Sequence, residues 1–247
     1  MLYQALFILL LINMPFAAVE DMAGIKSSLK GNDSKSLIVR KTPDFNISGD
    51  GSAENWSLTD WVIIPQRDFE NIALVTKVKT LYSDKGMYFL FYCEDRMLTA
   101  SMDKDFMDLW TEDVVEVFLM PDEQAPAYFE YEISPLNIEL PILVSNHNND
   151  LTRWMPFHYD ADRKVIHATN INGGIKKNKA TVKSWTAEFF IPFKLLRPLN
   201  NIQPVSGAKW RANFYRLDYD VNKIKWSWSL TEKNFHDYKN FGMLLFE

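Results

Sequence analysis

Short segments of alternating apolar and polar residues, with short runs of β-branched and aromatic residues, make up most of this 247-residue chain. Clusters of Gly, Pro, Asn and Asp separate these segments, as expected of strands joined by turns. The 3.6-residue period of an amphipathic helix is scarce. We therefore predict an all-β chain folded as an antiparallel β-sandwich, because many short strands with intervening turn signals favour that architecture. The predicted strands cover residues 73–81, 87–94, 113–120, 128–134, 164–169, 181–191, 210–217, 225–229 and 242–246.

The same alternation predicts which side chains of three strands face the core. The residues expected in the core are Phe89, Phe91, Val115, Val117, Phe189 and Ile191. Glu116 and Glu188, which lie between core residues, should then point to the opposite face. The sequence SDKG at residues 83–86 predicts a hairpin whose glycine is left-handed. Residues 137–160 and 195–206 are expected to form long connections.

Charge and cysteine content exclude some classes of protein. Lys+Arg number 27 and Asp+Glu number 32, so the formal net charge is -5. This sign opposes the electrostatic attraction on which nucleic-acid binding depends, and we expect no nucleic-acid partner. The single cysteine, Cys93, can form no intramolecular disulfide. Aromatic residues make up 14% of the chain, and they can fill a β core or supply flat platforms for ligands.

The N-terminus is similar to a secretory signal peptide. Residues 2–12 are almost wholly apolar, a run that suits a signal peptide and is far below the ~20 residues needed to cross a bilayer. We expect a signal peptide over residues 1–18, a flexible leader over 19–36 and one folded domain over 37–247. The chain is then exported to the periplasm or outside the cell, and its mature form has no membrane span.

Carboxylates are the residues that could carry catalysis. The sequence lacks the spacing of a zinc site, and it has no GxSxG elbow, P-loop or GxGxxG loop. Two carboxylates about 5 Å or about 6.5–9.5 Å apart could hydrolyse a glycoside. Alternatively, Glu130 and Glu132 share the solvent face of one strand through two-residue alternation. The candidate carboxylates are Glu112, Asp113, Glu116, Glu130, Glu132 and Glu188.

Eight sequence segments within residues 47–247, together with their order along the chain, indicate a protein family. They are ISGDGSAENW (47–56), VKTLYSDKGMYFLFYCED (78–95), WTEDVVEVFLMP (110–121), YFEYEISP (128–135), WTAEFFIPF (185–193), GAKWRANFYRLD (207–218), WSWS (226–229) and FHDYKNFGMLLF (235–246). In this order they resemble a carbohydrate-binding module of family 9, or the broader family-9-like group of DOMON-like β-sandwich domains.

The resemblance implies a single immunoglobulin-like β-sandwich that holds a sugar between two Trp rings. Trp110 would be one platform, and a Trp of the WSWS segment the other. A pyranose has apolar C–H faces and a rim of hydroxyls, which suits an aromatic plate flanked by carboxylate and guanidinium groups. The residues that the resemblance assigns to the ligand are Trp110, Glu112, Glu116, Arg216, Trp226 and Trp228. It also implies structural calcium, with Asp50, Asp60 and Asp95 as candidate ligands; no other cofactor is expected.

These observations favour an exported, non-catalytic carbohydrate-binding protein that supports polysaccharide catabolism. Its partners would be an oligo- or polysaccharide and secreted glycoside hydrolases. Two alternatives of other classes stay open. The first is a glycoside hydrolase that uses the carboxylates named above. The second is a haem-binding electron-transfer sandwich, for which Met97, Met102, Met107 and His158 are candidate ligands.

We predict that export removes about 18 residues, the length of the signal segment up to its small-residue site. Residues 1–18 contain no charged side chain, so cleavage leaves the net charge of -5 unchanged. N-terminal sequencing of the protein recovered from the envelope fraction or medium measures the cleavage site. Recovery of a chain that begins with Met1 would contradict the prediction.

Overall fold

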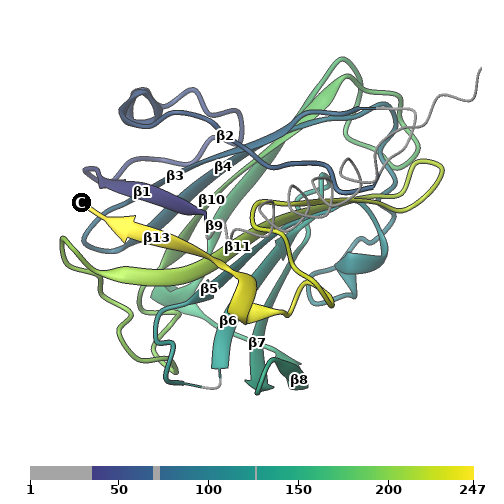
Figure 1. Cartoon of the computed structure of the whole chain (residues 1–247). Coiled ribbons are helices and arrows are strands. Elements are labelled where there is room, and N and C mark those ends of the chain that lie inside the picture. Colours follow the sequence, from purple (N-terminus) through teal and green to yellow (C-terminus); the bar gives the residue numbers. More distant parts are fainter. Residues whose placement is uncertain (1–34, 69–72, 126) are drawn as a thin grey trace, which may run out of the picture. The chain divides into compact units, whose positions relative to one another are not determined.

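The strands of the protein form one continuous, curled sheet (Figure 1). The structure, a computed structural model, describes residues 35–68, 73–125 and 127–247. The predicted signal peptide, residues 1–18, lies outside the described residues, as does the predicted leader up to residue 34. Ser36, placed at the end of that leader, is the first residue of a strand. Among the described residues, no helix is long and apolar enough to span a membrane.

The elements are short and almost all are strands. The strands are β1 (Ser36–Lys41), β2 (Val62–Ile63), β3 (Thr76–Tyr82), β4 (Gly86–Glu94), β5 (Val114–Met120), β6 (Ala127–Ile133), β7 (Glu139–His147), β8 (Asp150–Pro156), β9 (Ile166–Asn172), β10 (Ser184–Pro192), β11 (Lys209–Asp218), β12 (Ile224–Ser227) and β13 (Gly242–Phe246). Single 3₁₀ turns lie at η2 (Glu54–Leu58), η3 (Leu109–Thr111), η4 (Ala161–Arg163) and η5 (Tyr238–Asn240). The all-β prediction is confirmed.

Strand β1 joins the two layers of the sandwich. The sheet runs in the order β8-β7-β6-β5-β11-β13-β1-β3-β4-β10-β9, with β12 beside β11 and β2 beside β3. Residues 36–39 of β1 pair with β13, and Arg40 and Lys41 pair with β3. We call the strands from β8 to β13 with β12 the first layer, and those from β3 to β9 with β2 the second layer. The two pairings of β1 are parallel, whereas the other strand pairs are antiparallel as predicted.

The core lies between the two layers. The Tyr131 ring of the first layer packs 4.9 Å from Phe189 of the second, and Phe214 lies 6.0 Å from Phe89, measured between ring centroids. All six residues predicted to be core are fully buried there, so two-residue alternation assigned their faces correctly. Glu116 and Glu188 point to the other face of their strands, also as predicted.

The hairpin predicted at residues 83–86 joins β3 to β4, and Ser83 N–H donates to the Gly86 carbonyl at 2.9 Å. The prediction that Gly86 is left-handed was wrong, because its φ is not positive. Position 86 requires glycine for a different reason. A Cβ at Gly86 would lie 2.3 Å from the Ile191 carbonyl oxygen of β10 and 2.6 Å from the Phe190 ring, so the close approach of two strands excludes a side chain.

Strands β7 and β8 correct a second prediction, since residues 137–160 were expected to be a loop. β8 is an edge strand whose side chains are all exposed or half-buried, so it shows little apolar alternation. Asn148 and Asn149, both with positive φ (52° and 72°), form the tight turn between the two strands. Asn at consecutive positions is a hairpin signal that could have predicted it. The hairpin widens the first layer by two strands.

The segment at residues 47–56 is held to the second layer by one buried carboxylate. Glu188 Oε2 accepts hydrogen bonds from the backbone N–H groups of Ser48, Gly49 and Gly51, and Oε1 accepts from Trp56 Nε1 at 2.8 Å. Gly49 and Gly51 have φ of 92° and 70°, which favours glycine. The first segment of the family resemblance therefore has a structural role in this chain.

We predict that Phe91→Ala lowers the free energy of unfolding by roughly 3–5 kcal/mol, because it opens a cavity between the layers. The Phe91 ring is fully buried and stacks on Phe189, with a centroid distance of 6.0 Å. Denaturant unfolding measures the loss. Ile166→Ala, at an exposed position of β9, is the control and should change stability by less than about 1 kcal/mol. A loss below about 1 kcal/mol for Phe91→Ala would contradict the assigned core.

Candidate functional site

A cavity of about 580 Å³ lies on the face of the first layer that points away from the sandwich core. Its floor comes from neighbouring strands: Glu116 and Phe118 of β5, Glu130 of β6, Ile142 of β7 and Leu217 of β11. These side chains alternate with core residues along the same strands. One side of the layer therefore builds the core while the other builds the cavity.

Aromatic rings form a wall of this cavity. Trp110, in the turn η3, and Trp154, on the edge strand β8, meet edge to face with ring centroids 5.2 Å apart. The Trp154 side chain is 40% exposed and Trp110 is half-buried. Phe235 also lines the cavity and stacks on Tyr215 at 4.0 Å. The cavity thus offers accessible aromatic surface to a ligand.

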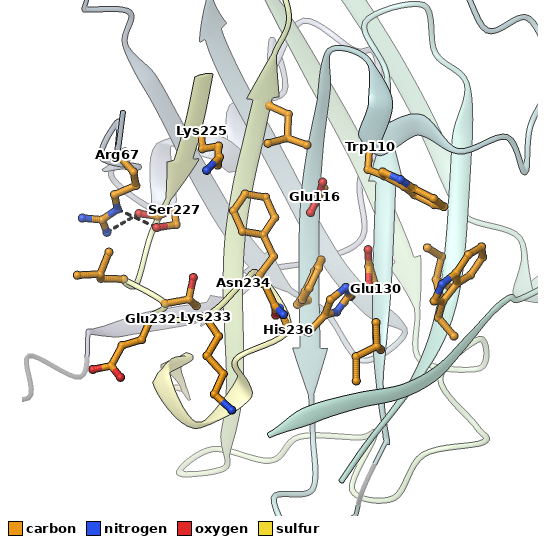
Figure 2. A pocket seen from close by; sticks show the side chains of 18 of the residues that line it. Arg67, Trp110, Glu116, Glu130, Lys225, Ser227, Glu232, Lys233, Asn234 and His236 are labelled. Carbon is orange, nitrogen blue, oxygen red and sulfur yellow. Dashed lines mark hydrogen bonds and ion pairs between the residues drawn. The ribbon is translucent and has the colours of Figure 1, made fainter. Parts of the chain in front are cut away.

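Carboxyl groups are buried at the floor. Figure 2 shows Glu116 and Glu130 on neighbouring strands, with Trp110 to one side. Glu116, Glu130 and Glu132 are only 2%, 4% and 0% exposed, and Glu132 is the cross-strand partner of Glu116. The Glu130 and Glu132 carboxyls share a side-chain hydrogen bond, which needs a proton on one of them. Like charges at such close positions repel each other.

Burial sets the protonation of this floor. It raises the pKa of Glu130 to about 8. Burial, together with the charge of Glu130, raises the pKa of Glu116 well above its usual range, and the pKa of Glu132 is raised in the same way. Burial lowers the pKa of His236 to about 4. His236 Nδ1 hydrogen-bonds to the Tyr128 hydroxyl at 2.7 Å and lies 3.8 Å from Glu130 Oε2.

Basic side chains line the cavity on the side away from Trp110 (Figure 2). Arg67 donates from Nε to Ser227 Oγ and from Nη2 to the Ser227 carbonyl, both at 2.7 Å. Lys225 lies 3.9 Å from Asp68, and Lys233 lies 3.2 Å from Asp150. These cations are therefore engaged by other groups of the protein.

Lys223 is the basic residue that acts on the floor. Its Nζ lies 5.3 Å from the centre of the Tyr219 ring. Its charge partly offsets the rise in the pKa of Glu116. The cavity therefore combines an aromatic wall, a buried carboxyl floor and a basic side formed by Arg67, Lys223, Lys225 and Lys233.

Comparison with known proteins identifies the family of this domain. The family model described as carbohydrate family 9 binding domain-like matches residues 47–247. The chain belongs to this family. The recognition made from the eight segments is confirmed, and every residue that lines the cavity, from Arg67 to His236, lies within the match.

One curated protein and one solved structure are similar to this chain. The chain is 26% identical over 181 residues, 69% of its length and 78% of the relative, to a protein of Arthroderma benhamiae described as an extracellular protein. A Bacteroides uniformis protein provisionally described as carbohydrate-binding has a TM-score of 0.72 at 17% identity, covering 86% of this chain and 99% of that one.

A family 9 module of Caldicellulosiruptor kristjanssonii, solved in complex with cellotriose, has a TM-score of 0.60 at 16% identity. The match covers 86% of this chain and 94% of the module. The same module in complex with glucose gives the same score and identity. These likenesses confirm the β-sandwich fold.

The family 9 domain brings together two of the six residues predicted to contact a ligand, Trp110 and Glu116. Three others, Arg216, Trp226 and Trp228, are 0%, 0% and 2% exposed. A sugar cannot stack on a ring that has no accessible surface, so the prediction for these three was wrong. The expected second platform was a Trp of the WSWS segment. In the structure the ring that meets Trp110 is instead Trp154.

Strand register explains this correction. Across the β5–β11 ladder Glu116 pairs with Tyr215, whereas Arg216 pairs with Val115 of the core. Adjacent positions on a strand point to opposite faces, so Arg216 enters the interior while Glu116 reaches the cavity. Trp226 is the β12 partner of Arg216 and points inward with it.

The other candidate carboxylates have local roles. Glu112 accepts hydrogen bonds from Ser101 N–H at 2.5 Å and from Met102 N–H at 3.2 Å, and it does not line the cavity. Glu130 and Glu132 do share one face, as alternation predicted, but that face is buried and not solvated. The residues considered for haem, Met97, Met102, Met107 and His158, lie outside the cavity lining.

The aspartates considered for calcium do not form one site. The described residues contain one group of three carboxylates with ligand atoms within 4.8 Å, which is Asp95, Asp218 and Asp220. Asp50 and Asp60 are not in it. Arg216 Nη2 already contacts Asp95 Oδ2 at 3.2 Å and Asp218 Oδ2 at 2.7 Å. Because the guanidinium supplies the positive charge and occupies these oxygens, the group does not fit a calcium ion.

Sequence reasoning missed Trp154, Phe235 and His236 as lining residues. Trp154 lies in the segment expected to be a loop, and its strand lacks alternation. Phe235 and His236 belong to the last segment of the family resemblance, and this position was the available signal. Only folding brings these residues beside Glu116, Phe118 and Glu130 on the cavity face of the first layer.

We predict that the free energy of unfolding falls as the pH rises from about 5 to about 8. The folded-state pKa of Glu130 is raised to about 8, whereas an unfolded Glu titrates near ~4.3. The folded state thus holds a proton that the unfolded state releases, so the stability contributed by Glu130 is lost over this range. Each such carboxyl contributes a slope of at most ~1.4 kcal/mol per pH unit.

Urea unfolding at several pH values measures this slope. Glu130→Gln should flatten it, because the amide does not titrate. Glu123→Gln is the matched control, since Glu123 forms an exposed ion pair with Arg211 outside the cavity; it should keep the slope of the unmodified protein. Equal slopes for all three proteins would refute the assignment of Glu130 as a buried protonated group.

Proposed function

We propose that this chain is a non-catalytic carbohydrate-binding protein that holds a saccharide in the cavity on the first layer. The observation that carries the proposal is the juxtaposition of the accessible Trp110–Trp154 pair with the buried carboxyls Glu116 and Glu130 in one cavity. An aromatic ring presents a flat apolar surface to the C–H face of a pyranose. The carboxyls can bind its hydroxyls.

The protonation of the floor suits a polyhydroxylated ligand. A protonated carboxyl has one O–H donor as well as acceptor capacity, whereas a carboxylate only accepts. Burial raises the pKa of both Glu116 and Glu130, so each can donate to one hydroxyl and accept from another. Neutral groups also avoid the cost of burying charge when the ligand excludes water.

The same protonation speaks against hydrolysis. A pair of catalytic carboxyls needs one ionised member to act as nucleophile or base while the other is protonated. Here burial raises the pKa of both cavity carboxyls, so neither is poised as the ionised partner near neutral pH. Binding without reaction is therefore the function that we assign.

Similar proteins support the class of ligand and the location. The Caldicellulosiruptor kristjanssonii module of the same fold was solved with cellotriose and with glucose, so β-linked glucose oligomers are the first ligands to test. The Arthroderma benhamiae relative is described as extracellular, which agrees with export of this chain. We propose that this chain acts outside the cytoplasm, beside secreted glycoside hydrolases, in polysaccharide catabolism.

We predict that Trp110→Ala weakens binding of cellotriose by roughly 5- to 150-fold, the equivalent of about 1–3 kcal/mol for a lost stacking platform. The melting temperature should change little, because the ring is only half-buried and the hydrogen bond from Tyr219 goes to the Trp110 backbone carbonyl. Calorimetric titration measures the affinity, and thermal unfolding measures the stability.

The control is Trp61→Ala. Trp61 is also half-buried but lies against Tyr92 and Lys77 of the second layer, so its loss should leave binding intact. An unchanged affinity for Trp110→Ala together with a large fall in melting temperature would make Trp110 a packing residue. Failure to bind any member of a glycan array would refute the proposed function.

A further inference from the structure

One side of the cavity is built from basic side chains that a neutral sugar does not require. Arg67, Lys223, Lys225 and Lys233 line it, and Figure 2 shows three of them on the side away from Trp110. They come from the segment after β2, from the turn between β11 and β12, from β12 itself and from the loop that follows it. Only the fold brings these charges to one surface.

Neutral groups hold the Arg67 guanidinium in place. The Arg67 backbone N–H donates to the Lys225 carbonyl at 2.8 Å. The side chain donates from Nε to Ser227 Oγ and from Nη2 to the Ser227 carbonyl, both at 2.7 Å, and Nη2 also donates to the Trp228 carbonyl at 3.3 Å. Among the described residues, no carboxylate pairs with Arg67. These hydrogen bonds leave the two N–H donors of Nη1 for a ligand, so the cavity holds a positioned guanidinium without a counter-ion.

Lys223 places a second positive charge close to the aromatic wall. Its Nζ lies 5.3 Å from the centre of the Tyr219 ring, and the Tyr219 hydroxyl donates to the Trp110 carbonyl at 2.8 Å. The Lys223 side chain is exposed and forms no ion pair within the described part of the chain. A ligand that stacks on Trp110 therefore lies near an ammonium group that has no carboxylate partner.

The acidic groups on the basic side are fewer than the cations. Asp68 lies 3.9 Å from Lys225, and Asp150 lies 3.2 Å from Lys233. Both lysines are exposed, and exposed ion pairs contribute little free energy, so a ligand can compete for these cations. Glu232 is the remaining carboxylate of this part of the lining, and it is exposed. The basic side thus keeps an excess of positive charge.

The carboxyl floor does not cancel this excess. Glu116 and Glu130 are 2% and 4% exposed, and burial raises the pKa of each, so they are mostly protonated at neutral pH. Glu130 also shares a side-chain hydrogen bond with Glu132, which needs a proton on one of them. Asp108 adds negative charge near Glu132 but does not line the cavity. The floor therefore supplies groups for hydroxyls, while the basic side is open to an anion.

We propose that the saccharide bound in this cavity is acidic, an oligosaccharide of uronic acid units. One sugar ring stacks on Trp110 and Trp154, and its carboxylate lies near Lys223. A further unit presents its carboxylate to the Arg67 guanidinium, whose planar donors suit two carboxylate oxygens. A uronic acid keeps the apolar C–H face of a pyranose and is ionised at neutral pH. This inference rests on the proposed function, since it names the class of sugar for the same site.

The net charge of the chain opposes this preference and so makes it informative. A chain of net charge -5 attracts a cationic sugar and repels an acidic one. The Debye length is about 8 Å at physiological ionic strength, so groups close to the ligand act most strongly. Tighter binding of an acidic sugar would therefore come from the local basic side and not from the charge of the whole protein.

The test compares cellotriose with the β-1,4-linked glucuronic acid trimer, which carries carboxylates in place of the C6 hydroxymethyl groups. Calorimetric titration at pH 7 should show about tenfold tighter binding of the glucuronic acid trimer, because it adds charge-assisted hydrogen bonds. The methyl ester of this trimer, which has lost the charge, should bind no better than cellotriose. Added salt should reduce the preference, because it screens the attraction.

Variants assign the preference to the basic side. Lys223→Gln and Arg67→Gln each remove one charge, and each should weaken binding of the glucuronic acid trimer more than binding of cellotriose. The preference should then fall to about threefold or less. Arg67→Lys, which keeps the charge but loses the planar donors, should give an intermediate preference. Lys194→Gln is the matched control, since Lys194 forms an exposed ion pair with Asp162 outside the cavity; it should keep the preference of the unmodified protein.

The outcomes separate the two proposals. Cellotriose binding with equal or weaker binding of the glucuronic acid trimer overturns the inference and leaves the proposed function standing. A preference that the methyl ester shares, or that survives both Lys223→Gln and Arg67→Gln, also overturns it. Thermal unfolding checks that each variant folds, and if Arg67→Gln does not, the exposed Lys223→Gln and the conservative Arg67→Lys decide. If no saccharide binds, both proposals fail.

Discussion

The buried guanidinium of Arg216 is the interaction on which the arrangement of the two layers depends. From β11 of the first layer it donates to Thr76 Oγ1 of β3 at 3.1 Å and to the Glu94 carbonyl of β4 at 2.6 Å. It also pairs with Asp95 and Asp218. Losing one partner of a buried pair typically costs about 3–5 kcal/mol, because a charge is left uncompensated. These contacts of Arg216 thus fix β11 against the opposite layer. The same strand supplies Leu217 to the cavity floor.

One physical rule then divides the first layer into an interior and a ligand face. Along β5, Val115 and Val117 enter the core, while Glu116 and Phe118 reach the cavity. Such a sheet can be rigid and functional at once, since the packing that holds one face also positions the other. The β7–β8 hairpin extends the sheet and carries Trp154 to the wall. Strands supply the floor of the site, and loops complete it: η3, the turn that holds Lys223, the loop that holds Arg67, and residues 230–236 before η5.

The floor carboxyls lower the stability of the protein at alkaline pH but give the cavity its chemistry. Burial raises the pKa of Glu130 to about 8, so this carboxyl is protonated at neutral pH. A protonated carboxyl both donates and accepts hydrogen bonds. An apolar floor would fold more easily but could not recognise hydroxyl groups. A buried cluster of carboxyls such as Glu116, Glu130 and Glu132 is thus what a binding site, rather than a structural core, would retain.

The sequence by itself determined the properties that depend on local spacing. Two-residue alternation gave the strand class, the six core residues and the shared face of Glu130 and Glu132, and the order of eight segments gave the family. Alternation states which residues lie together but not which face the rest of the chain covers. For that reason Arg216 and Trp226 were wrongly expected at a sugar site and Glu130 on a solvated face. Only the tertiary structure decided these points, because burial depends on contacts between layers and loops that are distant in sequence.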